Sequence, residues 1–229
     1  MDNQDELKKK AAERAVDFID SGMVLGLGTG STANFAIERI GEKIRSGDLQ
    51  GIVGIPSSER TANLARKLNI ALTDLVANPA IDLTIDGADE VDPDLNVIKG
   101  GGGALLREKI VAQASRRNII IVDESKLSPQ LGTKWALPIE VVPFAYKTEQ
   151  IFLESIGASV ALRQDTDKDP YLTNQKNYIL DANFGPISDP GALVADLNAR
   201  AGIVEHGLFL GLATDVIVAG QDDIRHLRR

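Results

Sequence analysis

The chain has 229 residues, 43% hydrophobic and 25% charged, which is typical of a soluble globular protein with a full core. It contains no cysteine and only two histidines far apart, so disulfide, thiolate and zinc chemistry are not expected, and we predict no metal. A net charge of −8 with 4% aromatic residues argues against nucleic-acid binding. No apolar run approaches the roughly 20 residues of a membrane span, so we expect a cytoplasmic protein.

The first 126 residues alternate between strand and helix patterns. Strands are expected at the apolar runs 23–27, 52–55, 81–85 and 119–122. Helices are expected where apolar residues recur at helical spacing, over 7–19, 33–44, 60–68 and 105–115. Ser31 and Thr32 are expected to cap the second of these helices. Strands that alternate with helices predict a doubly wound parallel sheet, the Rossmann-like form of the α/β class.

After Lys126 the pattern changes, with five prolines between 138 and 190 and a polar loop over 165–177. Strands are expected over 139–142, 159–162 and 178–181, and helices over 147–156 and 193–199. This mixture predicts a small α+β domain, 133–207, inserted into a larger domain made of 1–132 and 208–229. The apolar run 216–219 is expected to return to the main sheet.

The glycine-rich segment 26–32 (Gly-Leu-Gly-Thr-Gly-Ser-Thr) links the first strand to a helix, and such a turn can cradle a phosphate on backbone N–H groups. A dinucleotide site fits poorly, because Ser31 replaces the third glycine and the second strand ends in Pro56, Ser57 and Ser58 without an acidic residue. A Walker motif is excluded because Gly-Lys-Ser/Thr is absent. The alternative is a tight turn with a hydroxyl cap and no ligand.

Carboxylates follow the third strand directly, where open α/β sheets place their ligands. The cluster consists of Asp86, Asp89, Glu90 and Asp92. It has no evident structural purpose in the sequence, and clustered carboxylates are typical of proton-transfer sites. A solvated acidic turn is the alternative.

Four consecutive glycines, 100–103, lie between Lys99 and the helix that carries Glu108. Each glycine inside a helix or strand lowers the stability by about 0.5–1 kcal/mol, so a run of four is costly as a plain linker. We expect these glycines instead to let backbone amides line a pocket. Glu108 would lie about one turn into the helix and face the loop, although a surface glutamate is the alternative. Lys126 follows the fourth strand and would bind a phosphate if it lay near the glycine-rich turn.

Five segments in this order resemble the A-type ribose-5-phosphate isomerases: 28–32, 86–90, 99–102 with Glu108, 123–126 and 205–209. The resemblance extends from the first helix to Gly220. It implies a Rossmann-like domain with an inserted ferredoxin-like domain, no cofactor, and a homodimer or homotetramer. Residues 173–177 (Thr-Asn-Gln-Lys-Asn) depart from the usual Thr-Asp-Asn-Gly-Asn, which puts the geometry of that turn in question.

The resemblance also implies residue roles in converting D-ribose 5-phosphate to D-ribulose 5-phosphate. Glu108 would be the base that moves a proton between C1 and C2, and Lys99 would stabilise the enediolate. Asp86 and Asp89 would act on the sugar hydroxyls. Further substrate contacts would come from Lys8, Thr29, Gly30, Ser31, Thr32, Gly87, Ala88, Gly100, Gly101, Gly102 and Lys126. Aldose–ketose conversion independently requires a carboxylate base, a proton donor for the oxygens and a cation near the oxyanion.

Two other functions are possible for this pattern. A non-catalytic sugar-phosphate sensor would need a DNA-binding module, for which we expect the roughly twenty residues before the first strand to be too few. A CoA-transferase-like enzyme would use Glu108 as a nucleophile, but the phosphate-type turn and the chain length argue against it. We therefore expect an enzyme whose only partners are a sugar phosphate and copies of itself, with no nucleic acid and no membrane.

Overall fold

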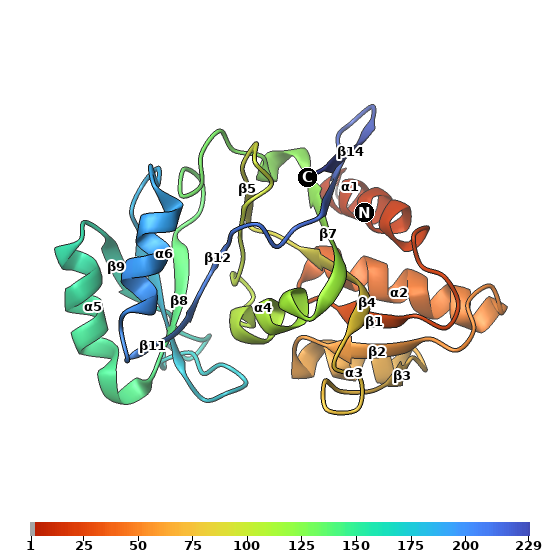
Figure 1. Ribbon diagram of the computed structural model, residues 1–229, viewed down its shortest axis with the longest axis horizontal. Coiled ribbons are helices and arrows are strands. Elements are labelled where there is room, and N and C mark those ends of the chain that lie inside the picture. Colours follow the sequence, from red (N-terminus) through yellow and green to blue (C-terminus); the bar gives the residue numbers. More distant parts are fainter. Residues whose placement is uncertain (1–2) are drawn as a thin grey trace. The chain divides into compact units, whose positions relative to one another are not determined.

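The computed structural model describes residues 3–229, which form two compact units (Figure 1). The first unit runs to Ala88 and adds Arg107–Lys126 and Gly211–Arg229. The second comprises Asp89–Leu106 and Leu127–Leu210. Within residues 3–229, no helix is both long enough and apolar enough to cross a membrane.

The first unit is built on a seven-stranded sheet, in the order β14-β13-β7-β4-β1-β2-β3. Its strands are β1 (Val24–Leu27), β2 (Val53–Pro56), β3 (Ala71–Leu72), β4 (Ile81–Gly87), β7 (Ser115–Asp123), β13 (Asp215–Ala219) and β14 (Ile224–Arg228). All neighbouring strands pair in parallel except β13 and β14. The prediction of a doubly wound parallel sheet is confirmed.

Helices cover both faces of this sheet. They are α1 (Asn3–Val16), α2 (Ser31–Ser46), α3 (Glu59–Lys67) and α4 (Leu105–Gln113), with a 3₁₀ turn at η1 (Glu124–Lys126). On one face, Leu25 and Leu27 of β1 share a core with α1 and α2. Gly26 points the other way, because successive strand residues alternate, and a Cβ there would meet Val111 of α4 at 2.7 Å.

The prediction that Ser31 and Thr32 cap α2 is wrong, because they are its first two helical residues and Gly30 is the N-cap. Gly30 has φ 127° and ψ 172°, which only glycine adopts readily, so the chain enters the helix from this glycine. Gly30 makes no side-chain cap hydrogen bond to the first N–H groups of this helix.

The second unit contains a four-stranded antiparallel sheet in the order β11-β8-β10-β9. Its elements are β8 (Leu137–Val141), η2 (Pro143–Ala145), α5 (Tyr146–Ser155), β9 (Ser159–Leu162), β10 (Tyr178–Asn183), α6 (Pro190–Asn198) and β11 (Ile203–His206). The succession β-α-β-β-α-β in this spatial order is the ferredoxin-like arrangement, as predicted. A second small sheet joins β5 (Glu90–Val91), β6 (Val97–Ile98) and β12 (Leu208–Phe209).

This unit includes the whole predicted insertion, 133–207, and also 89–106, 127–132 and 208–210. The limits of the insertion as a domain remain a prediction. The turn at 173–177, where the sequence departs from the usual pattern, closes with Thr173 N–H donating to Asn177 O at 2.9 Å. Lys176 occupies the position of the usual glycine and has φ 65°. Lys176 therefore adopts a left-handed backbone conformation, which residues with a Cβ disfavour.

Glu140 on β8 is a buried carboxyl group that no functional prediction covers. Its Oε1 accepts hydrogen bonds from Thr173 Oγ1 and Asn177 Nδ2, both at 2.9 Å. Its Oε2 has no hydrogen-bond partner among residues 3–229. Burial raises the pKa of Glu140, the two hydrogen bonds lower it in part, and the charge of Glu205 raises it further.

The second unit should therefore lose stability as the pH rises. The raised pKa of Glu140 means that the folded state keeps a proton above pH 4.5, where the unfolded state releases it. Replacing Glu140 by Gln removes this titration. Denaturation from about pH 4.5 to 7.5 should show the free energy of unfolding falling more in the wild type than in Glu140→Gln. Parallel pH profiles for the two proteins would contradict the assignment.

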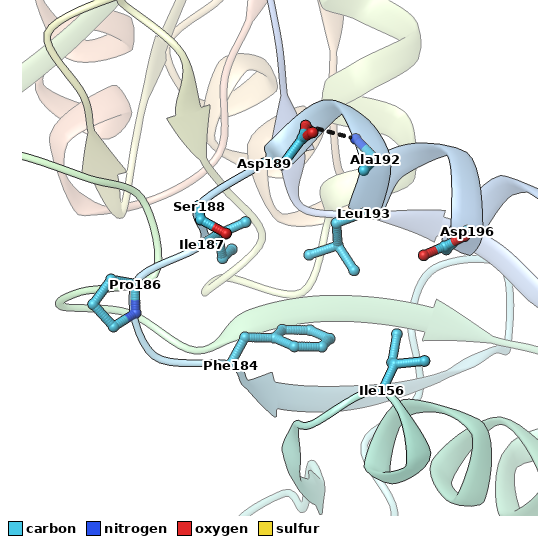
Figure 2. Close-up of a pocket in the computed structure, with 9 residues that line it drawn as sticks. All are labelled: Ile156, Phe184, Pro186, Ile187, Ser188, Asp189, Ala192, Leu193 and Asp196. Atoms are coloured by element: carbon cyan, nitrogen blue, oxygen red, sulfur yellow. Dashed lines mark hydrogen bonds between the residues drawn. The ribbon is translucent and has the colours of Figure 1, made fainter.

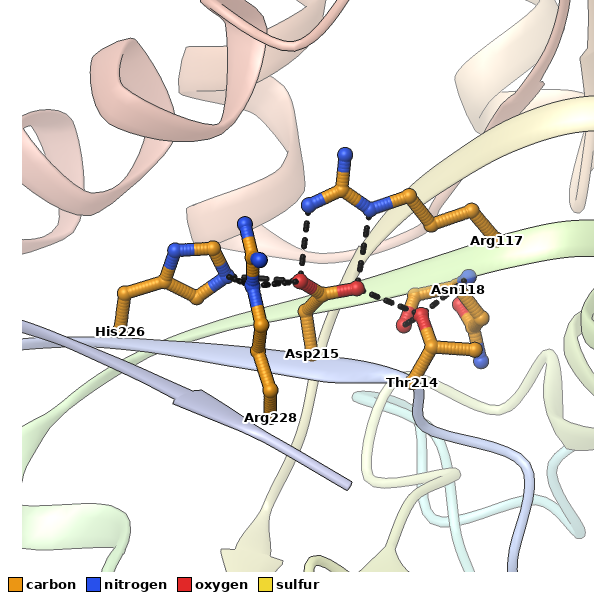
Figure 3. Close-up of polar contacts among 6 residues, drawn as sticks. All are labelled: Arg117, Asn118, Thr214, Asp215, His226 and Arg228. Atoms are coloured by element: carbon orange, nitrogen blue, oxygen red, sulfur yellow. Dashed lines mark hydrogen bonds and ion pairs between the residues drawn. The ribbon is translucent and has the colours of Figure 1, made fainter.

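A second buried carboxylate, Asp215, starts β13 and joins three strands of the first unit (Figure 3). Arg117 on β7 donates to both carboxylate oxygens, at 2.7 and 2.9 Å, and Thr214 Oγ1 donates at 2.7 Å. On β14, His226 Nε2 lies 2.6 Å from Oδ1 and Arg228 Nε lies 3.4 Å away. Burial opposes the charge, but these hydrogen bonds outweigh it and hold the pKa of Asp215 well below its usual range.

We expect Asp215→Asn to lower the free energy of unfolding by about 2–3 kcal/mol at neutral pH, because charged donors lose their acceptor. A lowered pKa stabilises the fold above the ordinary value of 3.8. The difference between wild type and variant should therefore shrink as the pH falls below about 4. Urea denaturation measures this. Asp17→Asn is the control, because the Asp17 side chain also forms ion pairs but is 53% exposed. We expect this variant to change the free energy of unfolding by less than about 0.5 kcal/mol.

Candidate active site

The strand order of the first unit reverses between β1 and β4, because the chain leaves β1 towards β2 and returns at β4 on the other side. Open α/β sheets bind ligands at this point, outside the carboxyl ends of the strands. Leu27 of β1 is in register with Ile85 of β4. The glycine-rich turn, which follows β1, and Asp86, near the last residue of β4, therefore lie at the same end of the sheet.

The turn and Asp86 are joined directly. Thr29 N–H donates to Asp86 Oδ1 at 3.0 Å, and Gly87 N–H donates to the same oxygen at 2.8 Å. A Cβ at Gly28 would lie 2.3 Å from Asp86 Oδ1, so only glycine lets the carboxylate approach the backbone this closely. Asp86 itself is buried. The structure thus holds a carboxylate in one orientation against the predicted phosphate turn.

The Thr29 hydroxyl belongs to a buried cluster of hydroxyl groups. Thr29 Oγ1 lies 2.8 Å from Ser57 Oγ, 2.9 Å from Ser58 Oγ and 3.0 Å from Thr61 Oγ1. Thr61 Oγ1 donates to Gly28 O at 2.9 Å, and Ser58 caps α3 by accepting from Thr61 N–H at 3.1 Å. These bonds fix the backbone of the turn. They give the Thr29 side chain a structural task, while its N–H orients Asp86.

Glu108 lies in the first turn of α4 and is 4% exposed. The alternative of a surface glutamate is therefore wrong. Arg107, the residue before it, forms an ion pair with Glu59 of α3 at 2.9 Å, which ties the start of α4 to the first unit. A buried carboxylate in a fixed helical turn has the rigidity that a general base requires.

The carboxyl end of β7 lies next to β4 in the sheet and leads into η1, which carries the half-buried Lys126. Ser125 N–H donates to Asp123 Oδ1 at 2.9 Å, which shapes this turn. The first turn of α1 is close by, since Gln4 Nε2 lies 3.5 Å from Asp123 Oδ2. Lys8 is one turn further along α1 and pairs with Asp5 at 3.2 Å.

Ser31 is exposed at the start of α2, and Thr32 is half-buried. Thr32 packs against Gly87, where an added Cβ would lie 3.7 Å from Thr32 Cβ. Predicted residues of the first unit thus lie at or just after the carboxyl ends of β1, β4 and β7, while Lys8 lies on α1 and Glu108 on α4. Hydrogen bonds and packing join Thr29 with Asp86, and Thr32 with Gly87.

The remaining predicted residues lie in the second unit, on the glycine loop 100–103 and beside it. Gly103 N–H donates to Gly100 O at 2.9 Å and closes the loop. Gly101 N–H donates to Asp89 Oδ2 at 2.7 Å. A Cβ at Gly101 would lie 2.6 Å from Asp89 Oδ1, so glycine is needed for this contact. Asp89 and the loop are therefore one structural element, with Gly102 exposed beside them.

Lys99 is 3% exposed, and its Nζ lies 5.7 Å from the centre of the Phe209 ring. Its N–H donates to Gly207 O at 2.9 Å. A Cβ at Gly207 would lie 2.3 Å from Lys99 O, so this glycine allows the two segments to pair. The segment 205–209, which the resemblance singled out, thus supports Lys99.

Two members of the acidic cluster have structural tasks, which corrects the expectation that the cluster has none. Glu90 is fully buried and accepts hydrogen bonds from Gly132 N–H at 2.9 Å and Lys134 N–H at 3.1 Å. Asp92 accepts from Asn96 N–H at 2.8 Å and closes a turn. The functional prediction is therefore kept for Asp86 and Asp89 alone.

The second unit also has a cavity of about 310 Å³ that contains no predicted site residue (Figure 2). It lies beside the start of α6, where Asp189 accepts from Ala192 N–H at 2.9 Å. Its other lining residues are Ile156, Phe184, Pro186, Ile187, Ser188, Leu193 and Asp196. No group of three or more metal-ligating side chains occurs anywhere in the described part of the chain.

Comparison with known proteins identifies the family. A family model described as Ribose 5-phosphate isomerase A (phosphoriboisomerase A) matches residues 53–223. The Ribose-5-phosphate isomerase A of Desulfatibacillum aliphaticivorans is 58% identical over 228 residues, covering 100% of this chain and 99% of that protein. The chain belongs to the ribose 5-phosphate isomerase A family. A further member, from Chloroflexus aurantiacus, is 60% identical over 220 residues, covering 96% of this chain and 92% of that protein.

Solved structures of ribose 5-phosphate isomerases share the fold. The enzyme from Plasmodium falciparum superposes with a TM-score of 0.95 at 42% identity, covering 98% of this chain and 99% of that one. A D-ribose-5-phosphate isomerase in complex with phospho-erythronic acid gives 0.96 at 42% identity, covering 99% of each chain. As a member of this family, the chain is an isomerase.

Sequence reasoning missed residues that support the candidate site. From the sequence, Ser57 and Ser58 showed only that no acidic residue follows the second strand, and Thr61 had no predicted role. Their signal was a hydroxyl-rich segment after the second strand. Arg163, which contacts the glycine loop, had no sequence signal because it is a single residue about 60 positions away.

Proposed function

We propose that this chain interconverts D-ribose 5-phosphate and D-ribulose 5-phosphate through an enediolate, without a metal or nicotinamide. The observation that carries the proposal is the junction of β1 and β4, where a phosphate-type glycine turn hydrogen-bonds a buried carboxylate. Family membership along nearly the whole chain supports it. A sensor would have no need for Asp86, Asp89, Lys99 and Glu108 together.

The chemistry needs only proton transfers. With the sugar in its open form, Glu108 takes the proton from C2 and the electron pair enters the enediolate. Glu108 then returns the proton to C1, so the carbonyl group moves from C1 to C2 with no net oxidation. Asp86 and Asp89 carry protons to and from the ring oxygen and between O1 and O2. Lys99 stabilises the negative charge that develops on the oxygens.

The phosphate anchors the substrate. Ser31, Thr32 and Lys126, with Lys8 of α1, bind it in this proposal. The remaining substrate contacts come from Thr29, Gly30, Gly87, Ala88, Gly100, Gly101 and Gly102. The support is that the N-cap residue of α2 is Gly30, which makes no side-chain cap hydrogen bond to the first N–H groups of the helix. Helix N-termini of this kind favour phosphate. Binding energy from the phosphate positions the reacting carbons.

The test is the formation of ketose from ribose 5-phosphate by protein dialysed against EDTA, with no nicotinamide and no CoA added. We expect full activity under these conditions. Loss of activity on chelation that a divalent ion restores would contradict the metal-free mechanism. Turnover that requires CoA would favour the acyl-transfer alternative, in which Glu108 is a nucleophile.

The assembly and location are proposed on the family resemblance. We propose a cytoplasmic homodimer or homotetramer, in which the insertion spans 133–207. Light scattering on the purified protein tests the assembly, and a monomeric mass at working concentration would contradict it. Cell fractionation tests the location.

A further inference from the structure

Arg163, the residue after β9, holds the glycine loop from the side of the ferredoxin-like sheet. Its Nη1 donates to Gly100 O at 2.8 Å and to Gly101 O at 3.1 Å. Its Nε donates to Asp181 Oδ2 at 2.9 Å, and Nη2 pairs with the other oxygen of Asp181. The Arg163 side chain is 15% exposed. A largely shielded guanidinium group thus binds two consecutive carbonyl groups of the loop.

This contact determines where the loop's N–H groups point. In a trans peptide the N–H lies opposite the carbonyl of the preceding residue, and no described peptide bond is cis. With Gly100 O and Gly101 O turned towards Arg163, the N–H groups of Gly101 and Gly102 are turned away from it. The bond from Gly101 N–H to Asp89 Oδ2 at 2.7 Å agrees with this geometry. Arg163 therefore aims two adjacent donors away from itself, the first of them at Asp89.

The neighbouring backbone strengthens the hold. Tyr171 N–H donates to Arg163 O at 2.9 Å, so the two residues are fixed together. The Tyr171 ring lies against Gly103, where an added Cβ would come within 2.3 Å of its hydroxyl oxygen. Gly103 has φ 77° and Gly100 has φ 103°, conformations that glycine adopts readily, so contacts with neighbouring residues are what select this one shape of the loop. A flexible run of glycines is thereby clamped at both ends.

We propose that Arg163, oriented by Asp181, is a positioning residue for catalysis: it holds Gly101 N–H on Asp89 and presents the amide of Gly102, with Lys99, to the charge that develops on the substrate oxygens. This inference rests on the proposed isomerase function. Preorganised backbone donors act most strongly where charge forms in the transition state. The loss of Arg163 should therefore reduce kcat more than it changes KM.

The experiment compares Arg163→Lys with Arg200→Lys. Arg200 makes the same kind of fork to Glu149, at 2.9 and 3.3 Å, within the same unit, and the hydrogen bonds of its guanidinium go to Glu149. We expect Arg163→Lys to lower kcat for ribose 5-phosphate by about 10–100-fold with KM changed less than about threefold. We expect Arg200→Lys to keep the wild-type kcat. Asp181→Asn should act in the same direction as Arg163→Lys, and replaces it if that variant does not fold.

Hydrogen exchange of the amides in 100–103 is the second readout. It should accelerate in Arg163→Lys and stay at the wild-type rate in Arg200→Lys. Wild-type kcat in folded Arg163→Lys, or equal losses in the two arginine variants, would overturn the proposal. If the wild type itself does not isomerise ribose 5-phosphate, the proposed function fails. Unchanged exchange in Arg163→Lys would then show separately that Arg163 does not hold the loop.

Discussion

Glu108→Gln should abolish turnover of ribose 5-phosphate while substrate binding remains close to that of the wild type. The amide keeps the shape of the side chain but cannot accept the proton from carbon. Loss of a positioned base typically costs about 10²–10⁴-fold in rate. Glu108 is buried in the first turn of α4, so we do not expect another side chain to take its place as the base. Steady-state kinetics and equilibrium binding of ribose 5-phosphate measure the two quantities.

Glu149→Gln is the matched control. Glu149 is also a buried glutamate, 3% exposed, in the first turn of a helix, α5, but it pairs with Arg200. We expect this variant to lose stability through the weakened ion pair and to keep its kcat. A near-normal kcat in Glu108→Gln would remove Glu108 from the mechanism. Equal losses of kcat in both variants would point to a general effect of replacing buried glutamates.

Lys99→Ala is expected to slow the chemical step by up to about 10²–10³-fold, or about 2.7–4 kcal/mol, if it is equivalent to removing one oxyanion donor. Lys99 is buried beside Phe209, and the pairing of its N–H with Gly207 O fixes its backbone. The ammonium group of Lys99 should therefore hold a fixed position. Its charge should contribute most when the enediolate forms. The expected signature is a fall in kcat with a smaller change in KM.

Lys126→Ala provides the contrast, because it removes the same charge from a residue proposed to bind the phosphate. A phosphate held equally in the ground and transition states contributes uniform binding. Its loss should raise KM and leave kcat little changed. Circular dichroism and a denaturation curve for each variant establish that both fold. If Lys126→Ala lost kcat at constant KM and Lys99→Ala did the reverse, the two roles would be assigned the wrong way round.

The sequence predicted the elements that have strong local signals. Apolar runs next to glycine or polar turns marked β1, β4 and β7, and the helix after the glycine-rich turn was found with its start two residues late. Strands of two residues, such as β5 and β6, bury too few side chains to leave a pattern. The edge strand Ile224–Arg228 was missed because charged residues occupy much of it, as is common where a sheet edge meets solvent.

The candidate site could be proposed from the sequence where neighbouring residues share a task. Asp86 lies at the carboxyl end of its strand, and Glu108 lies about one turn after the glycines, so spacing alone suggested both. The supports of the site come from distant segments. Thr29 meets Thr61 across 32 residues, and Arg163 meets Gly100 across 63. No local pattern encodes such pairs, since their choice depends on how the finished elements pack.

The path of the chain between the two units has a consequence for folding during synthesis. The chain passes from one unit to the other after Ala88, Leu106, Lys126 and Leu210. The large sheet therefore stays incomplete, with β7 at its edge, until the entire second unit has left the ribosome and β13 can pair. Its closing ion pair, between Arg117 and Asp215, spans 98 residues. An exposed edge of this kind invites association between nascent chains. The yield of folded protein should thus depend on how quickly 127–210 is translated and folds.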